Sequence, residues 1–233
     1  MVNNCILNGV KSNTVKGLLI QSLPTISKPL LRTQIEEIDG RDGDIVTPLG
    51  YSAYNKKMVI GLYGDYEIDD VIKYFDSQGT VIFSNEPDKY YNYQIIDQID
   101  FERLLRFKTA SVIFHVQPFK YSAVEGAKSF DTTGLEKITI INSGNTKAKP
   151  ILTVYGDGLV SLSLNGMQLF NLNITNEYIT IDVGEMQAYM DNIFMNRYVS
   201  GDYDNLVLDI GSNTLSWTGD VSEIVVEKFS RWI

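Results

Sequence analysis

Nearly the whole chain consists of short segments that alternate apolar and polar residues or run apolar for a few positions. Such segments, separated by Gly, Pro, Asn and Asp, are typical of β-strands, because successive side chains of a strand point to opposite faces. No apolar run reaches the roughly 18 residues that a transmembrane helix needs. The pattern therefore predicts a mainly β protein.

The first half carries one helical pattern among its strands. Ile68, Val71, Ile72 and Phe75 recur at helical spacing, behind acidic residues that favour a helix N-terminus. We expect one helix on a mostly antiparallel sheet, an α+β domain whose last strand ends at Pro118, which lacks a backbone donor. The strands expected in this half span residues 5–7, 17–23, 30–38, 57–63, 80–83, 90–96, 102–107 and 109–116.

The apolar signal drops between residues 122 and 134, which are rich in Gly, Ser, Thr and Asp. A polar stretch of this kind is typical of a crossing between domains. We therefore predict two domains, residues 1–125 and 126–233. The chain is long enough for two cores, since it has 233 residues and is 44% hydrophobic.

In the second half, strand patterns recur at the spacing of a β-sandwich, about every 8 to 12 residues. Asn165 and Gly166 between two of them predict a two-residue hairpin turn. The expected strands are 137–142, 150–155, 160–164, 167–172, 178–183, 188–191, 206–208, 214–217 and 223–229. The second domain is predicted to be an all-β sandwich of jelly-roll type.

Bulk properties exclude several classes of protein. Cys5 is the one cysteine, so no intrachain disulfide can form, and the N-terminus lacks the pattern of a signal peptide. The net charge is −9 and neither half has a basic patch, which argues against specific nucleic-acid binding. We expect a soluble protein with no membrane insertion.

A turn with the sequence Asp39-Gly40-Arg41-Asp42-Gly43 follows the strand expected at 30–38. Glycine supplies positive φ and Asp caps its own backbone, so any exposed loop could carry such residues. A calcium loop needs oxygen ligands at alternate positions and a Glu at the twelfth, and Asp39, Asp42 and Asp44 do not keep that register. We therefore expect no metal here.

Catalytic motifs are lacking in the sequence. The single histidine, His115, lies in an apolar run at a spacing that places it on the same strand face as Ile113, which favours a structural role. Adjacent carboxylates such as Glu36 and Glu37 are read as surface charge. No phosphate-binding loop, CxxC or HExxH motif occurs, so we expect a non-enzymatic protein without a cofactor.

The ordered set of features resembles one family. The turn at 38–43, the helix, the strand closing at 117–119, and the entry to a sandwich at 141–145 and 149–152 resemble the distal tail (Dit) proteins of long-tailed phages of Gram-positive bacteria. The resemblance covers essentially the whole chain. It implies that the first domain forms a hexameric ring around a DNA channel and that the second is a peripheral, galectin-like or carbohydrate-module-like jelly roll.

The resemblance also implies partners and a location. The protein would be a hub at the distal end of the tail of a phage or prophage virion, made in the cytoplasm of the bacterial host. It would join the major tail (tube) protein to tail-associated, tape-measure and receptor-binding proteins and let DNA pass without binding it. An acidic wall fits that passage, because like charge repels phosphates.

The aromatic content is also compatible with assembly. The chain has 14 Tyr, 10 Phe and 2 Trp, residue types that are enriched at interfaces, and they are densest at Tyr90-Tyr91-Asn92-Tyr93. In a strand, Tyr91 and Tyr93 share one face and Tyr90 takes the other. The sequence leaves open whether this cluster meets a partner or covers the core.

A carbohydrate-binding module that contacts host cell-wall saccharide is the alternative function. Trp217 is the candidate saccharide platform, because an indole face can stack on a sugar ring. Galectins use a His, Arg and Glu set, whereas His115 lies in the other domain and Arg197 and Arg231 are the only arginines after residue 125. The usual burial of Trp favours a core position for Trp217.

Overall fold

The structure is a computed structural model that describes residues 2–76 and 78–233. The chain divides into two compact units, Met1–Ala123 together with Ile233, and Val124–Trp232. The division falls two residues before the boundary predicted at 125. Each unit has its own hydrophobic core, and the protein is mainly β, as predicted.

Unit 1 is built on one antiparallel sheet with strand order β2-β1-β7-β8-β9-β6-β3. Two further strands, β4 and β5, form a separate two-stranded sheet and, within the described residues, pair only with each other. The strands are β1 (Cys5–Leu7), β2 (Val10–Lys11), β3 (Leu18–Ser22), β4 (Leu31–Glu36), β5 (Ile45–Tyr51), β6 (Tyr54–Leu62), β7 (Gln78–Phe83), β8 (Lys89–Gln94) and β9 (Thr109–Ser122), with a short 3-10 turn, η1, at Ser12–Thr14.

The predicted helix is present as α1 (Ile68–Phe75), whose Val71 and Phe75 are buried in the core. A second helix, α2 (Phe101–Phe107), replaces the strand predicted at 102–107, and that prediction was wrong. The Asp100 side chain caps its first turn by accepting from the Arg103 amide at 2.8 Å, and Leu104 is its buried residue. The cap and the helical spacing outweigh the β-like composition of the segment.

Strand β9 also departs from the prediction that the sheet ends at Pro118. It continues to Ser122 and stays paired with β8 on both sides of the proline. The register shifts there, since Tyr93 pairs with Val116 and Tyr91 with Lys120. The irregularity takes up Pro118, whose missing amide donor then costs no ladder hydrogen bond.

Unit 2 is all β apart from two short 3-10 turns, η2 (Asn196–Tyr198) and η3 (Tyr203–Asn205). The strand predicted at 206–208 was wrong, because residues 206 and 207 have no regular structure and Leu208 forms only an isolated bridge with Ala148. The strands are β10 (Lys128–Asp131), β11 (Lys137–Asn142), β12 (Ile151–Leu164), β13 (Met167–Ile174), β14 (Tyr178–Asp182), β15 (Gln187–Met190), β16 (Ile193–Phe194), β17 (Val199–Gly201), β18 (Gly211–Glu227) and β19 (Arg231–Trp232).

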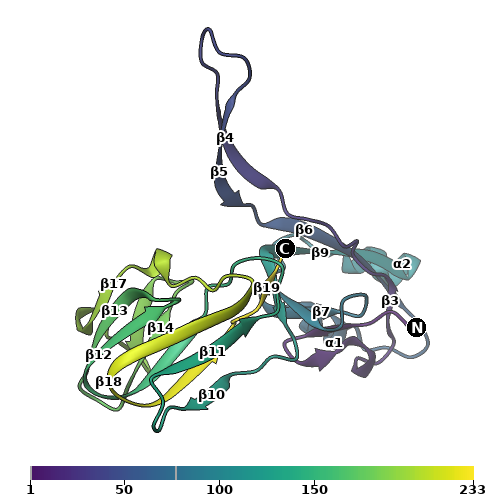
Figure 1. Cartoon of the computed structure of the whole chain (residues 1–233). Coiled ribbons are helices and arrows are strands. Elements are labelled where there is room, and N and C mark those ends of the chain that lie inside the picture. The colour runs from purple at the N-terminus through teal and green to yellow at the C-terminus, as the bar shows by residue number, and fades with distance from the viewer. Residues whose placement is uncertain (1, 77) are drawn as a thin grey trace. The chain divides into compact units, whose positions relative to one another are not determined.

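Two long strands, β12 and β18, run side by side through the nine-stranded antiparallel sheet of unit 2 and contribute to both of its layers (Figure 1). The first half of β12 pairs with β14 and its second half with β13, while β18 pairs first with β11 and then with β10. The close approach of β12 to β18 needs glycine: a Cβ on Gly156 would lie 2.1 Å from the Asp220 carbonyl oxygen, and one on Gly219 2.2 Å from that of Leu159. The core fills the space between the layers.

The hairpin predicted at Asn165-Gly166 is confirmed. The two residues join β12 to β13 with φ of 51° and 84°, the left-handed conformation that a tight two-residue turn requires. The Asn165 side chain also accepts from the Thr214 amide at 2.8 Å, which ties the turn to β18.

Candidate assembly interface

The hairpin β4–β5, which we call the arm (residues 31–51), projects away from the body of unit 1 (Figure 1). Every residue of β4 is exposed, and the residues of β5 between its two ends are exposed as well. The sequence predicted β4 within 30–38 but missed β5, because Pro48 and Gly50 look like turn residues. Both residues fit in a two-stranded arm with a register shift beside Arg32 and Thr33, because no third strand pairs with β5 and requires a donor from Pro48.

The two faces of the arm differ in character. Cross-strand partners share a face, so one face carries the pairs Leu31 with Tyr51, Thr33 with Pro48 and Ile35 with Val46. Ile35 and Val46 are 59% and 56% exposed. The other face carries the polar residues Arg32, Gln34, Glu36 and Thr47, together with one apolar residue, Ile45, which pairs with Glu36. The arm is thus amphipathic, with its apolar face uncovered in the isolated chain.

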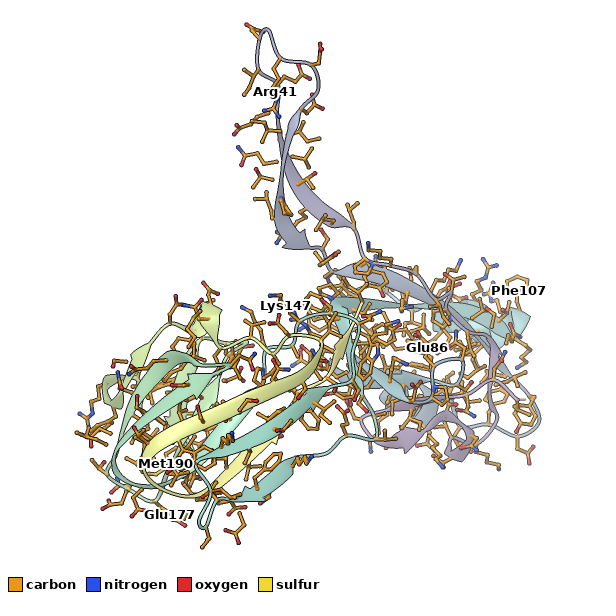
Figure 2. The ribbon with its side chains drawn as sticks, in the orientation of Figure 1. Arg41, Glu86, Phe107, Lys147, Glu177 and Met190 are labelled. Carbon is orange, nitrogen blue, oxygen red and sulfur yellow. The ribbon has the colours of Figure 1, made fainter. Side chains whose placement is uncertain are left out.

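The turn Asp39-Gly40-Arg41-Asp42-Gly43 forms the far end of the arm, where Figure 2 labels Arg41. The Arg41 amide donates to the Ile38 carbonyl at 3.1 Å, and Gly40 has φ of 81°, which is the geometry of a turn with glycine at its third position. Five carboxylates and one guanidinium lie between Glu36 and Asp44. The tip is therefore acidic and carries one exposed apolar side chain, Ile38.

The connector 23–30, which leads from β3 into the arm, is held by hydrogen bonds from side chains of the body. Asn85 Nδ2 donates to the Pro24 carbonyl at 2.9 Å, Lys56 Nζ to that of Thr25 at 2.9 Å, and Tyr54 Oη to that of Ser27 at 3.4 Å. These bonds fix the root of the arm on the body of unit 1.

Behind the connector lies a buried charged cluster of Lys56, Glu86, Tyr91 and Lys120, and Figure 2 labels Glu86. Lys120 Nζ is 2.8 Å from Glu86 Oε1, and Tyr91 Oη donates to Glu86 Oε2 at 2.5 Å. Lys56 Nζ lies 4.8 Å from the centre of the Tyr91 ring. Each charge in the cluster has a partner, as burial requires.

The cluster shifts the pKa values of its members. Burial lowers the pKa of Lys56 to about 8, although the Glu86 carboxylate opposes the shift. Burial alone would raise the pKa of Glu86, but the hydrogen bonds from Lys120 and Tyr91 outweigh it and hold the pKa below the usual range. The proton on Lys56 is therefore held more weakly than that of an ordinary lysine.

The other candidate residues are dispersed over the molecule. Trp217 is 7% exposed and belongs to the core of unit 2, so little of its indole can meet a ligand. Half-buried His115 lies outside the core, and its Nδ1 is 2.9 Å from Asn55 Oδ1. Of the tyrosine cluster, Tyr91 and Tyr93 are buried, while Tyr90 stacks on Tyr121 at 5.6 Å between ring centres.

Within residues 2–76 and 78–233, no group of three or more His, Cys, Asp or Glu side chains is arranged to hold a metal ion. No described helix is long and apolar enough to cross a membrane. The apolar face of the arm is the candidate assembly surface, because cross-strand pairs such as Ile35 with Val46 are exposed along it.

The chain is a two-unit, mainly β protein with an extended hairpin, and solved structures with a similar fold exist. No family model matches the chain, and no curated protein matches it. The Dit protein of SPP1, described as a hub of the adsorption apparatus in phages that infect Gram-positive bacteria, matches over 100% of both chains with a TM-score of 0.65 and 15% identity.

Chains from two structures of the phage P2 baseplate in its activated conformation, with Ca and with Sr, also match. Their TM-scores are 0.56 and 0.55 at 10% identity, and the alignments cover 97% or more of each chain. At these identities the likeness establishes the fold. The chain has the fold of the SPP1 Dit hub protein, and the resemblance predicted from the sequence is confirmed at that level.

Proposed function

We propose that this protein is a non-enzymatic structural hub of a phage or prophage tail tip. The observation that carries the proposal is the arm, because an isolated two-stranded hairpin is at best marginally stable in water and this one exposes an apolar face. The fold of the chain is similar to that of a protein described as an adsorption-apparatus hub. An arm with an uncovered apolar face is what we expect of a structural protein that assembles with other chains.

Unit 1 would form a closed ring, with the arm of each copy packing on the next. A surface on one copy that binds a different surface on its neighbour gives a ring when the rotation closes. We expect six copies, the number that the family resemblance implies. Unit 2, whose apolar residues are largely enclosed in its own core, would lie at the periphery as a jelly-roll, galectin-like module.

In the tail, the ring would continue the tube and hold the adhesion apparatus. Its partners would be the major tail protein, the tail-associated or tape-measure proteins and the receptor-binding proteins. DNA would pass through the hole without specific binding, which is compatible with the net charge of −9. The protein would thus reside at the distal end of the tail in the virion.

The mass of the purified protein by light scattering, with electron microscopy of the assembled species, tests the proposal. We expect a ring of six copies with a central hole, formed alone or on the tail tube. A twofold dimer without a pore inside assembled tails would contradict it.

A further inference from the structure

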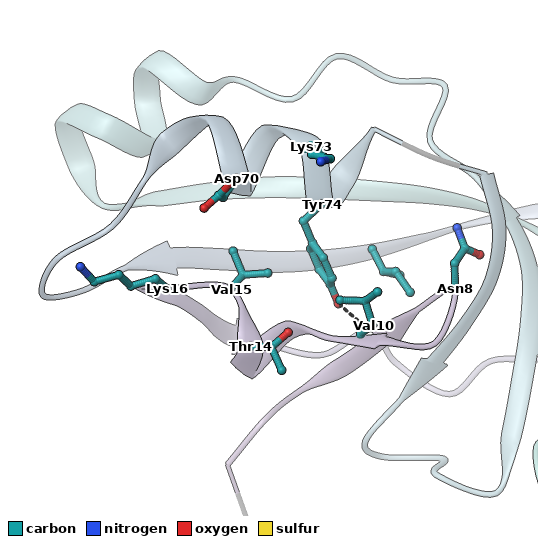
Figure 3. Close-up of a pocket in the computed structure, with 9 residues that line it drawn as sticks. Asn8, Val10, Thr14, Val15, Lys16, Asp70, Lys73 and Tyr74 are labelled. Atoms are coloured by element: carbon teal, nitrogen blue, oxygen red, sulfur yellow. Dashed lines mark hydrogen bonds between the residues drawn. The ribbon is translucent and has the colours of Figure 1, made fainter.

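Unit 1 contains a groove of about 400 Å³ between helix α1 and the segment that runs from β1 through β2 and η1 (Figure 3). Its apolar lining comes from Leu7, Val10, Val15 and the ring of Tyr74. The Tyr74 hydroxyl is engaged within the fold, since it lies 3.2 Å from the Cys5 carbonyl and 3.1 Å from that of Val10. The ring is therefore available for apolar contact, while its polar end needs no ligand.

The charged groups of the groove are Lys16 and Lys73, with Asp70 beside them on α1 (Figure 3). All three side chains are exposed. Three other hollows of unit 1 lack this combination. One is lined by uncharged residues, one has two acids against two arginines, and one has a single aspartate.

The tip of the arm complements the groove in three respects. It carries one apolar side chain, Ile38, which is 47% exposed. It carries an excess of carboxylates, including Asp39 and Asp42, where the groove has an excess of lysines. It also carries one cation, Arg41, where the groove has one carboxylate, Asp70.

We propose that the arm tip of one copy docks in the α1 groove of a second copy, with Ile38 over Val15 and Tyr74 and with Arg41 facing Asp70. This inference rests on the proposed assembly and specifies its contact. The arm projects away from the body of its own copy, so the groove it fills belongs to another copy (Figure 1). Tip and groove are different surfaces, so each copy can donate one arm and receive one, which is the contact a ring needs.

A charge exchange tests the contact in the full-length protein. Arg41→Glu and Asp70→Arg are each expected to weaken assembly about tenfold, measured as the concentration at half assembly by light scattering. The double variant restores an attractive pair and should return near the wild-type value. Lys57→Glu is the matched control, because Lys57 is an exposed lysine of β6 outside the groove lining, and it should leave assembly unchanged.

Disulfide trapping between copies supplies a second readout that does not depend on affinity. Copies with Ile38→Cys are mixed with copies with Val15→Cys, and we expect a disulfide-linked dimer in the mixture but little in either variant alone. Native Cys5 is buried and should stay unreactive.

The outcomes separate this inference from the proposed function. A double variant as weak as the two single changes combined, or single variants that behave like Lys57→Glu, would overturn the docking site while the ring stands. A wild-type chain that shows no assembly, alone or on tails, would overturn both. Rescue in the double variant together with the mixed disulfide would establish the contact.

Discussion

The arm of unit 1 and the β12–β18 pair of unit 2 are both long antiparallel ladders, yet they bury their residues in opposite ways. Strand β12 alternates inward apolar residues such as Leu152 and Val154 with outward ones, and its inward face is closed by the second layer. In the arm, Ile35 and Val46 face solvent from an equally regular ladder. A ladder covered within its own chain is a folding element, whereas an uncovered one is a surface for another chain.

Deleting the arm should have the largest effect on assembly. Ser52 donates its amide to the Leu30 carbonyl at 2.9 Å, so a short Gly-Gly link from Leu30 to Ser52 can replace residues 31–51 without moving the body. We expect assembly to weaken by on the order of 100-fold or more, because the main contact is removed. Light scattering measures this, and the thermal midpoint of unfolding should stay near the wild-type value. An unchanged assembly would show that the arm is dispensable.

A large-to-small substitution in the core of unit 2 should lower stability and leave assembly unchanged. Phe170 is fully buried, and its ring lies 5.1 Å from that of Tyr203. Phe170→Ala should lower the free energy of unfolding by about 3 to 5 kcal/mol, measured by urea denaturation. Assembly at low temperature should persist. Loss of the ring in a folded Phe170→Ala protein would mean that unit 2 takes part in the interface.

A glycine of unit 2 and a glycine of the arm have similar backbone conformations but different surroundings. Gly219 and Gly43 have φ of 99° and 77°, but a Cβ on Gly219 would meet the Leu159 carbonyl oxygen, whereas one on Gly43 meets nothing within 4 Å. Gly219→Ala should therefore cost about 3 kcal/mol, and Gly43→Ala about 1 kcal/mol of local strain in the arm. Denaturation curves of both variants check the difference. Equal costs would show that the β12–β18 crossing can relax.

A pH dependence of stability is expected at the root of the arm. Lys56 has a folded pKa of about 8 and an ordinary value of 10.5, so unfolding takes up a proton between these pH values. Its contribution makes the folded state more stable as pH rises from about 8 to 10.5. Lys56→Met should remove that rise in the free energy of unfolding relative to wild type. If the free energy of unfolding depends on pH in the same way in both proteins, Lys56 does not have the lowered pKa.

Several elements could be predicted because their signals are local. The apolar spacing of α1 and the pair Asn165-Gly166 determine a helix and a turn with little help from the rest of the fold. Strand β5 could not be found in this way. Pro48 and Gly50 argue against a strand in a sheet, and the arm tolerates them because its edges are unpaired.

The site was predictable in part. The turn at residues 39–43 stood out in the sequence, but its place at the tip of an exposed arm follows from a pairing that the sequence did not reveal. The buried cluster of Lys56, Glu86 and Lys120 was missed, because charged residues are usually exposed and these three come from separate elements. The α1 groove was missed for the same reason, since its lining joins residues 7–16 to 70–74.

We propose that the contacts of assembly lie in unit 1 and that unit 2 folds independently of them. The mass of a chain truncated to residues 1–125, measured by light scattering beside the full-length protein under the same conditions, tests it most directly. We predict a folded protein with the same copy number as the full chain, because the arm and the α1 groove both lie in unit 1. A folded monomer beside a full-length ring would contradict the claim and place the assembly contacts in unit 2.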